Sequence, residues 1–150
     1  PRSEFAPKAQ FTVGDYYYNI QSYDEAMVAY EKVADQYSNS AEAPRAVALV
    51  GELSEIQASF DYNKAMKFFE AKNYDEAVLG LQEIIRKYPA TYTELAAHCN
   101  LGLIYEITRQ WPQAAENYQV VEEKGGDKPE NADVVGFAKI HRDWIVENRL

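Results

Sequence analysis

An all-α fold of antiparallel helix pairs, stacked as a right-handed solenoid, is the fold class that we expect for this chain. Three observations predict it. Apolar residues recur at helical spacing along the 150 residues, helix-start residues recur with them, and similar segments return along the chain. Repeats of about 20–50 residues are typical of solenoids, because each unit buries its apolar face against the next. We therefore expect about seven helices.

Three similar segments begin the second helix of each expected pair. Residues 22–26 read SYDEA, residues 73–77 read NYDEA and residues 110–114 read QWPQA, and an apolar stripe at helical spacing follows each. Ser22 and Asn73 are predicted to cap their helices through the side chain, each with a Glu three residues later. Pro112 suits a first helical turn, where its missing N–H costs nothing.

Glycines recur in the helices that precede these segments, at Gly14, Gly51 and Gly102. A glycine inside a helix costs about 1 kcal/mol relative to alanine. We therefore expect each of the three to allow close approach of a neighbouring helix.

The chain resembles the tetratricopeptide repeat family at these positions. The matching residues follow that family's order of Gly, Tyr, small residue and aromatic residue, and they are Gly14, Tyr17, Ala26 and Tyr30, then Gly102, Tyr105, Ala114 and Tyr118, with Ala77, Leu81 and Pro89 in the middle copy. The junctions at 40–44 and 88–89 also resemble a bacterial cell-envelope subgroup, the tol-pal-associated and outer-membrane assembly proteins. The resemblance implies a solenoid whose first helices line a concave, protein-binding groove.

The middle repeat carries extra residues. Successive helix-A glycines lie 37 and 51 residues apart, whereas successive helix-B alanines, at 26, 77 and 114, lie 51 and 37 apart, so 14 residues are inserted between Gly51 and Ala77. Fourteen residues make about 3.9 helical turns, so an insert within one helix nearly preserves its facing. We predict one extended helix over about 43–72. The alternative is a break at 59–61, which gives two helices.

The expected helices cover residues 7–20, 23–37, 43–72, 75–87, 92–108, 112–124 and 131–147. Gly125 and Gly126 are expected to end the sixth helix. The last helix is expected to cap the solenoid, with Val134, Phe137, Ala138, Ile140 and Trp144 on its covering side. We expect a single domain over 1–150, with repeats at 7–38, 43–89 and 92–125. The chain starts at Pro1, and we expect it to be a fragment of a longer protein.

Composition excludes several functions. The net charge of −9 disfavours nucleic acid as a partner, and no apolar run approaches the about 20 residues that membrane insertion needs. The sequence has no phosphate loop, metal signature or nucleophile motif. His98 and Cys99 are neighbours on a helix, where side chains point about 100° apart, so they do not form a catalytic pair. We therefore expect no enzyme activity, no cofactor and no metal, and the compartment stays undetermined.

Two surfaces are candidates for protein binding. The groove positions implied by the resemblance include Lys8 and Arg45, and the binding candidates among them are acidic, aromatic or polar: Phe11, Asp15, Tyr18, Asn19, Glu52 and Glu55. They suit a basic and apolar peptide. Where chaperone-binding relatives clamp an acidic C-terminus with Lys, Asn and Arg, the matching positions hold Phe11, Asp15 and Asn19, and only Asn19 fits. The second surface is an apolar patch on the extended helix, made by Phe60, Tyr62, Met66 and Phe69 together with Phe68. We expect a scaffold or adaptor; the alternative is a structural spacer or a self-association module that forms homo-oligomers.

Overall fold

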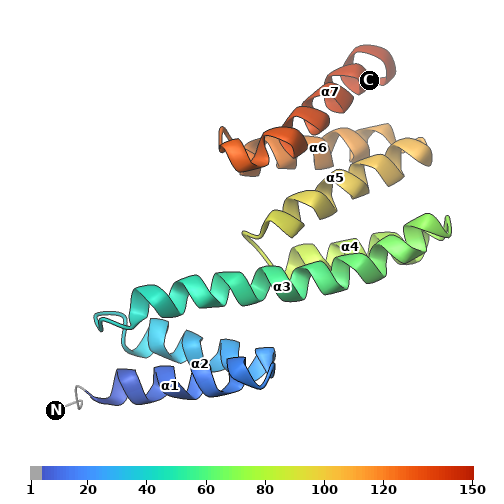
Figure 1. Cartoon of the computed structure of the whole chain (residues 1–150). Helices are drawn as coiled ribbons and strands as arrows, with labels where there is room; N and C mark the ends of the chain where they lie inside the picture. The colour runs from blue at the N-terminus through green and yellow to red at the C-terminus, as the bar shows by residue number, and fades with distance from the viewer. Residues whose placement is uncertain (1–4) are drawn as a thin grey trace. The chain divides into compact units, whose positions relative to one another are not determined.

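The computed structural model describes residues 5–150, and every regular element in that range is helical (Figure 1). The elements are α1 (Phe5–Asn19), α2 (Tyr23–Gln36), α3 (Ala43–Glu70), α4 (Tyr74–Lys87), α5 (Tyr92–Ile107), α6 (Trp111–Gly125), the short 3₁₀ helix η1 (Pro129–Asn131) and α7 (Ala132–Arg149). The all-α, seven-helix fold class is confirmed. No helix within residues 5–150 combines the length and the apolar character that crossing a membrane requires.

The extended helix is confirmed as one element. α3 runs without interruption through Ser59, Phe60 and Asp61, the point at which the alternative placed a break (Figure 1). It ends at Glu70, and Lys72 then takes a positive φ of 59° in the turn to α4.

The described residues form two compact units, which divide between Ile56 and Gln57 within α3. In unit 1, which ends at Ile56, α1 packs against α2 and the first half of α3 completes the core. Its buried apolar residues are Phe11, Ala26, Tyr30, Val33, Ala46 and Leu53.

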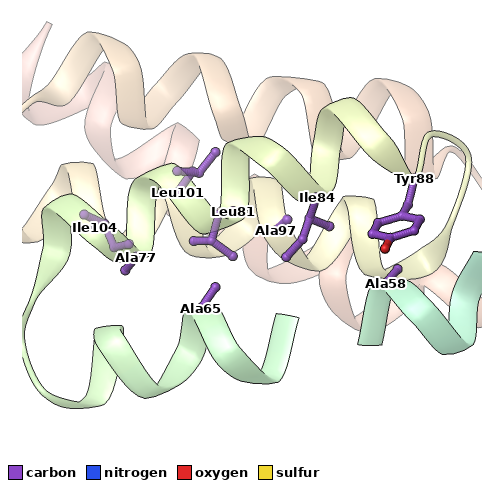
Figure 2. Close-up of a cluster of buried hydrophobic side chains, with 9 residues drawn as sticks. All are labelled: Ala58, Ala65, Ala77, Leu81, Ile84, Tyr88, Ala97, Leu101 and Ile104. Atoms are coloured by element: carbon purple, nitrogen blue, oxygen red, sulfur yellow. The ribbon is translucent and has the colours of Figure 1, made fainter. Parts of the chain in front are cut away.

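Unit 2, which begins at Gln57, contains two apolar clusters. Figure 2 shows the first, which joins the second half of α3 to α4 and α5 through Ala58, Ala65, Ala77, Leu81, Ile84, Tyr88, Ala97, Leu101 and Ile104. The second joins α5, α6 and α7 through Cys99, Ala114, Ala115, Tyr118, Val121, Ala138 and Ile145. The helix α5 contributes to both clusters, which explains why so many of its residues are buried.

The glycine prediction holds at two positions and is wrong at the third. A Cβ atom on Gly14 would lie 2.4 Å from the ring of Tyr30, and one on Gly102 would lie 2.6 Å from the ring of Tyr118. Nothing lies within 4 Å of such an atom on Gly51. The insert is the physical reason, because it moves the closely packed position 14 residues along α3, to Ala65.

The predicted side-chain caps at Ser22 and Asn73 are also wrong, since neither makes a capping hydrogen bond. The preceding residue takes a positive φ in both turns, and the cap's N–H instead donates to a carbonyl five residues back, from Ser22 to Tyr17 at 2.9 Å and from Asn73 to Phe68 at 2.8 Å. This is the bonding of a Schellman turn, in which the backbone closes the preceding helix. Pro112 does lie in a first turn, and α6 ends at Gly125, as predicted.

Candidate functional site

A cleft in unit 1 brings three predicted groove residues together. On α1, Tyr18 and Asn19 lie three and four residues after Asp15, so both are neighbours of Asp15 on the helix surface. Together with Tyr30 of α2 and Arg45 and Leu49 of α3 they line a cavity of about 400 Å³. We call these six residues the unit 1 cleft.

Two tyrosine–carboxylate hydrogen bonds position acidic groups at the unit 1 cleft, with Asp15 in its lining and Glu52 next to the lining residue Tyr18. The Tyr30 hydroxyl donates to Asp15 Oδ1 at 2.7 Å, and the Tyr18 hydroxyl donates to Glu52 Oε1 at 3.0 Å. Burial, followed by the bond to Asp15, raises the pKa of Tyr30, and the bond to Glu52 raises the pKa of Tyr18. Both phenols therefore stay protonated donors, which keeps the two carboxylates oriented with their other lone pairs available.

Phe11 and Arg45 modify the predicted groove. The Phe11 ring is only 6% exposed and lies 5.1 Å from the ring of Tyr30, so it belongs chiefly to the core of unit 1. The guanidinium of Arg45 lies 5.0 Å over the Phe11 ring, in a cation–π contact. The unit 1 cleft therefore presents one cation beside Asp15. Glu52 is exposed, and Glu55 is partly buried further along α3.

The predicted patch on α3 lies on more than one side of the helix. Tyr62 and Phe69 are partly buried against the first cluster of unit 2, and the Tyr62 hydroxyl accepts a hydrogen bond of 2.6 Å from Asn100. Met66 is also partly buried. Phe60, by contrast, is 60% exposed, and nine residues separate it from Phe69, which turns the two about 180° apart on a helix. These side chains therefore do not form one continuous face.

A second polar cluster, which the sequence did not reveal, joins α5, α6 and α7. Glu106 accepts hydrogen bonds from the Tyr118 hydroxyl at 3.2 Å and pairs with His141 Nδ1 at 2.9 Å. The His141 ring stacks on Phe137 with centroids 4.0 Å apart. His141 is thus half-buried.

Another cavity, of about 630 Å³, lies where the α4–α5 turn meets the end of α6 and η1. Its wall contains a helix cap that we did not predict, although Thr91 and Glu94 have the spacing of a capping box; here the glutamate reaches the N–H of the residue before the cap. Glu94 N donates to Thr91 Oγ1 at 3.0 Å, and Ala90 N donates to Glu94 Oε2 at 2.8 Å. Lys124 pairs with the same carboxylate, so Glu94 is already fully engaged.

The His98–Cys99 pair is structural. His98 Nδ1 lies 2.9 Å from Asn117 Oδ1, and burial raises the pKa of the Cys99 thiol to about 12. A thiol with so high a pKa is a poor nucleophile. Within residues 5–150, no group of three or more His, Cys, Asp or Glu side chains is arranged to hold a metal ion.

Two segments of the chain, residues 8–40 and 57–91, match the family model described as the tetratricopeptide repeat. The first segment spans α1 and α2, and the second spans the latter half of α3 together with α4. The second match begins at residue 57, six residues after Gly51 and within α3. No curated protein matches the chain. Tetratricopeptide repeats generally mediate protein–protein interaction, and domains built from them are typically scaffolds without catalytic activity.

Proposed function

From these two tetratricopeptide repeat segments and the unit 1 cleft, we propose that the chain is a non-catalytic scaffold that binds a peptide segment of another protein. The peptide is basic and apolar, and it occupies the unit 1 cleft. The observation that carries the proposal is the presence of Asp15, Tyr18 and Asn19 on one wall of a cavity of about 400 Å³.

The chemistry of the unit 1 cleft supports a partner with Lys or Arg beside apolar side chains. Asp15 and Glu52 are each held by a tyrosine hydroxyl, which leaves further lone pairs for an ammonium or guanidinium group. The ring of Tyr18 and the side chain of Leu49 offer apolar area in the same cavity, whereas Tyr30 is only 1% exposed and supports the wall from the core. Arg45 adds a site for a carboxylate or carbonyl of the peptide, so a mixed sequence suits the cleft better than a purely basic one.

The net charge of −9 supports the same choice, since long-range attraction speeds the approach of a basic segment. The α3 patch is the weaker candidate, because Phe60 faces away from Phe69 and Tyr62 is already bonded to Asn100. We infer that the unit 1 cleft is the principal site and that spacer or self-association roles are secondary.

The test uses two labelled 12-residue peptides that share Leu and Phe anchors, one with three Lys and one with three Glu. Fluorescence anisotropy measures their affinity for the wild-type chain and for the Asp15→Asn, Glu52→Gln variant, which keeps both hydrogen-bond acceptors but removes two charges. We expect the Lys peptide to bind preferentially and the variant to lose about tenfold in affinity or more, an effect that salt reduces.

The matched control is Glu31→Gln, Asp35→Asn, which removes the same charge from exposed positions of α2 outside the unit 1 cleft. Equal losses in both double variants would mean that only net charge matters, and equal affinity for the Lys and Glu peptides would contradict an acidic site.

A further inference from the structure

The last helix buries two of the five predicted covering residues, Val134 partly and Ala138 fully, and leaves the other three largely exposed. Ala138 and Ile145 are fully buried in the second cluster of unit 2, with Val134 and Val135 packed beside them. The predicted covering residues Phe137, Ile140 and Trp144 are instead 40%, 71% and 45% exposed. Apolar residues thus cover two sides of α7. One side is buried against α5 and α6, whereas on the other the rings of Phe137 and Trp144 touch Tyr118 and Trp111 of α6 at one edge only, with centroids 6.1 and 6.2 Å apart, and Ile140 is the most exposed residue.

The exposed residues form one regular row. Asp133, Phe137, Ile140, Trp144 and Glu147 are spaced by four, three, four and three residues, so they lie along a single helix face. We call these five residues the α7 ridge; it is about 21 Å long at about 1.5 Å per residue. A four-three alternation of apolar residues is the pattern by which one helix packs along another.

Each end of the α7 ridge carries an acid. Asp133 and Glu147 are both exposed, and neither forms an ion pair with a residue in the described range 5–150. The guanidinium of Arg149 lies 5.2 Å over the ring of Trp144, which makes the Glu147 end less acidic than the Asp133 end.

These charges decide between possible occupants. If a second copy of the chain packed its α7 ridge antiparallel on the first, Asp133 of each would face Glu147 of the other. A parallel pair would place each acid opposite itself. Both arrangements bring like charges together, which opposes association. A helix with bases at both ends instead complements the ridge.

We propose that the α7 ridge is a second protein-binding surface, whose partner is an amphipathic helix with an apolar seam bracketed by Lys or Arg. This is a helix-on-helix mode of recognition, and it is independent of the unit 1 cleft. The apolar centre supplies the contact area, and the two acids select the partner and its register.

The test uses the whole 150-residue chain and two labelled synthetic helical peptides. Both have Leu at three positions with four-three spacing; one has Lys at both ends of the seam and the other has Glu. Anisotropy should show binding of the Lys-ended peptide and at least about tenfold weaker binding of the Glu-ended peptide. Ile140→Asp should weaken binding of the Lys-ended peptide by at least about tenfold.

Val146→Asp is the matched control, because Val146 is 52% exposed on the same helix but about 180° from Phe137. It should change affinity by less than about twofold. The double variant Asp133→Lys, Glu147→Lys should prefer the Glu-ended peptide. Of the single reversals, Asp133→Lys should have the larger effect, because Arg149 already offsets Glu147.

Four results would overturn the proposal. They are equal affinity for the two peptides, equal losses from Ile140→Asp and Val146→Asp, no binding of the Lys-ended peptide at about 1 mM, or a dimer by light scattering that Ile140→Asp dissociates. The last result would assign the α7 ridge to a second copy of the chain.

Discussion

The α1–α2 pair of unit 1 and the α5–α6 pair of unit 2 rest on the same contact. In each, a tyrosine of the second helix lies against a glycine of the first, Tyr30 on Gly14 and Tyr118 on Gly102. In each, the tyrosine hydroxyl donates to a carboxylate of the glycine's own helix. The two pairs differ in what lies over that carboxylate.

In unit 1 the carboxylate, Asp15, lines an open cleft together with Tyr30. In unit 2 the carboxylate, Glu106, is covered by His141 of α7, which also stacks on Phe137. The same helix pair thus gives a binding cleft in one unit and a closed polar cluster in the other. The tyrosine–glycine contact therefore holds the two helices of a pair together. Whether the carboxylate beside it stays accessible depends on the helix that follows.

Weakening the packing of α7 on α5 and α6 should have the largest effect on the free energy of unfolding. Ile145 is fully buried under α7, so Ile145→Ala should lower the free energy of unfolding by about 2–5 kcal/mol in a urea titration. Cys99 reports the opening locally, because its thiol is buried, has a pKa raised to about 12 and lies 3.8 Å from the Val134 carbonyl of α7. We expect its reaction with a disulfide reagent at pH 8 to accelerate in the variant. Val33→Ala, in the core of unit 1, is the control; an equal acceleration there would contradict local opening.

The contact shared by the two pairs is tested by a double-mutant cycle. Gly102→Ala places a Cβ 2.6 Å from the Tyr118 ring, and the resulting strain of about 1–3 kcal/mol should outweigh the gain in helix propensity of about 1 kcal/mol. The middle pair has Ala65 and Leu81 at the equivalent positions, both buried. In a Tyr118→Leu background, Gly102→Ala should therefore become neutral or stabilising. Additive effects of the two substitutions in urea unfolding would show that the ring and the glycine are not coupled.

Much of the fold was predictable because it follows local periodicity. Helical spacing gave the seven helices, and the 14-residue excess predicted a continuous α3. The position of close packing was not predictable from Gly51, because a glycine is compatible with open space as well as with a near neighbour. The facing of α7 was not predictable either, because Ala138 and Ile145 on one side compete with Ile140 and Trp144 on another, and only the neighbouring helices decide between them.

Some contacts of the candidate site were likewise predictable from the sequence, and others were not. Asp15, Tyr18 and Asn19 line one cavity because their spacing on a single helix already placed them together. The cation–π contact of Arg45 depends on how α3 meets α1, and the pairing of His141 with Glu106 joins residues 35 apart in sequence. Such contacts arise from tertiary packing, for which a single sequence has no periodic signal.

Removing the negative charge should lower the stability of the fold more at Glu106 than at Asp15. Glu106 is 14% exposed and is contacted by both Tyr118 and His141, so Glu106→Gln leaves buried partners poorly satisfied and should cost about 1–3 kcal/mol. Asp15 borders the unit 1 cleft, and its Asn variant still accepts from Tyr30 while water reaches the rest of the amide. Asp15→Asn should therefore cost less than about 1 kcal/mol in urea unfolding. A larger loss of unfolding free energy from Asp15→Asn than from Glu106→Gln would contradict the view that Asp15 is the open site and Glu106 the closed one.

A fourth tyrosine–carboxylate bond, between Tyr88 after α4 and Asp61 of α3, offers the smallest effect and a test by pH. The Tyr88 hydroxyl donates to Asp61 Oδ2 at 2.8 Å. Burial alone would raise the pKa of Asp61, but hydrogen bonds from Tyr88 and Lys64, with the positive charges of Lys64 and Lys87, hold that pKa below its ordinary value. Because the folded-state pKa is the lower one, Asp61 stabilises the fold above its unfolded-state pKa of about 3.9, and this contribution is lost as the pH falls through the folded-state value.

Asp61→Asn should therefore flatten the decline in unfolding free energy below about pH 4, measured by urea titration at each pH. Tyr88→Phe, which removes only one of the donors, should flatten it less. The carboxylate is one-third exposed, so water screens these interactions and the change should be smaller than any of those above. Parallel curves for wild type and Asp61→Asn from pH 5 to pH 2 would show that the bond to Tyr88 orients the side chain without stabilising its charge. In that case the Tyr88 hydroxyl would stabilise a neutral acceptor at position 61 as well as an ionised one. The negative charge of such a carboxylate would then serve binding and not folding, as we propose for Asp15.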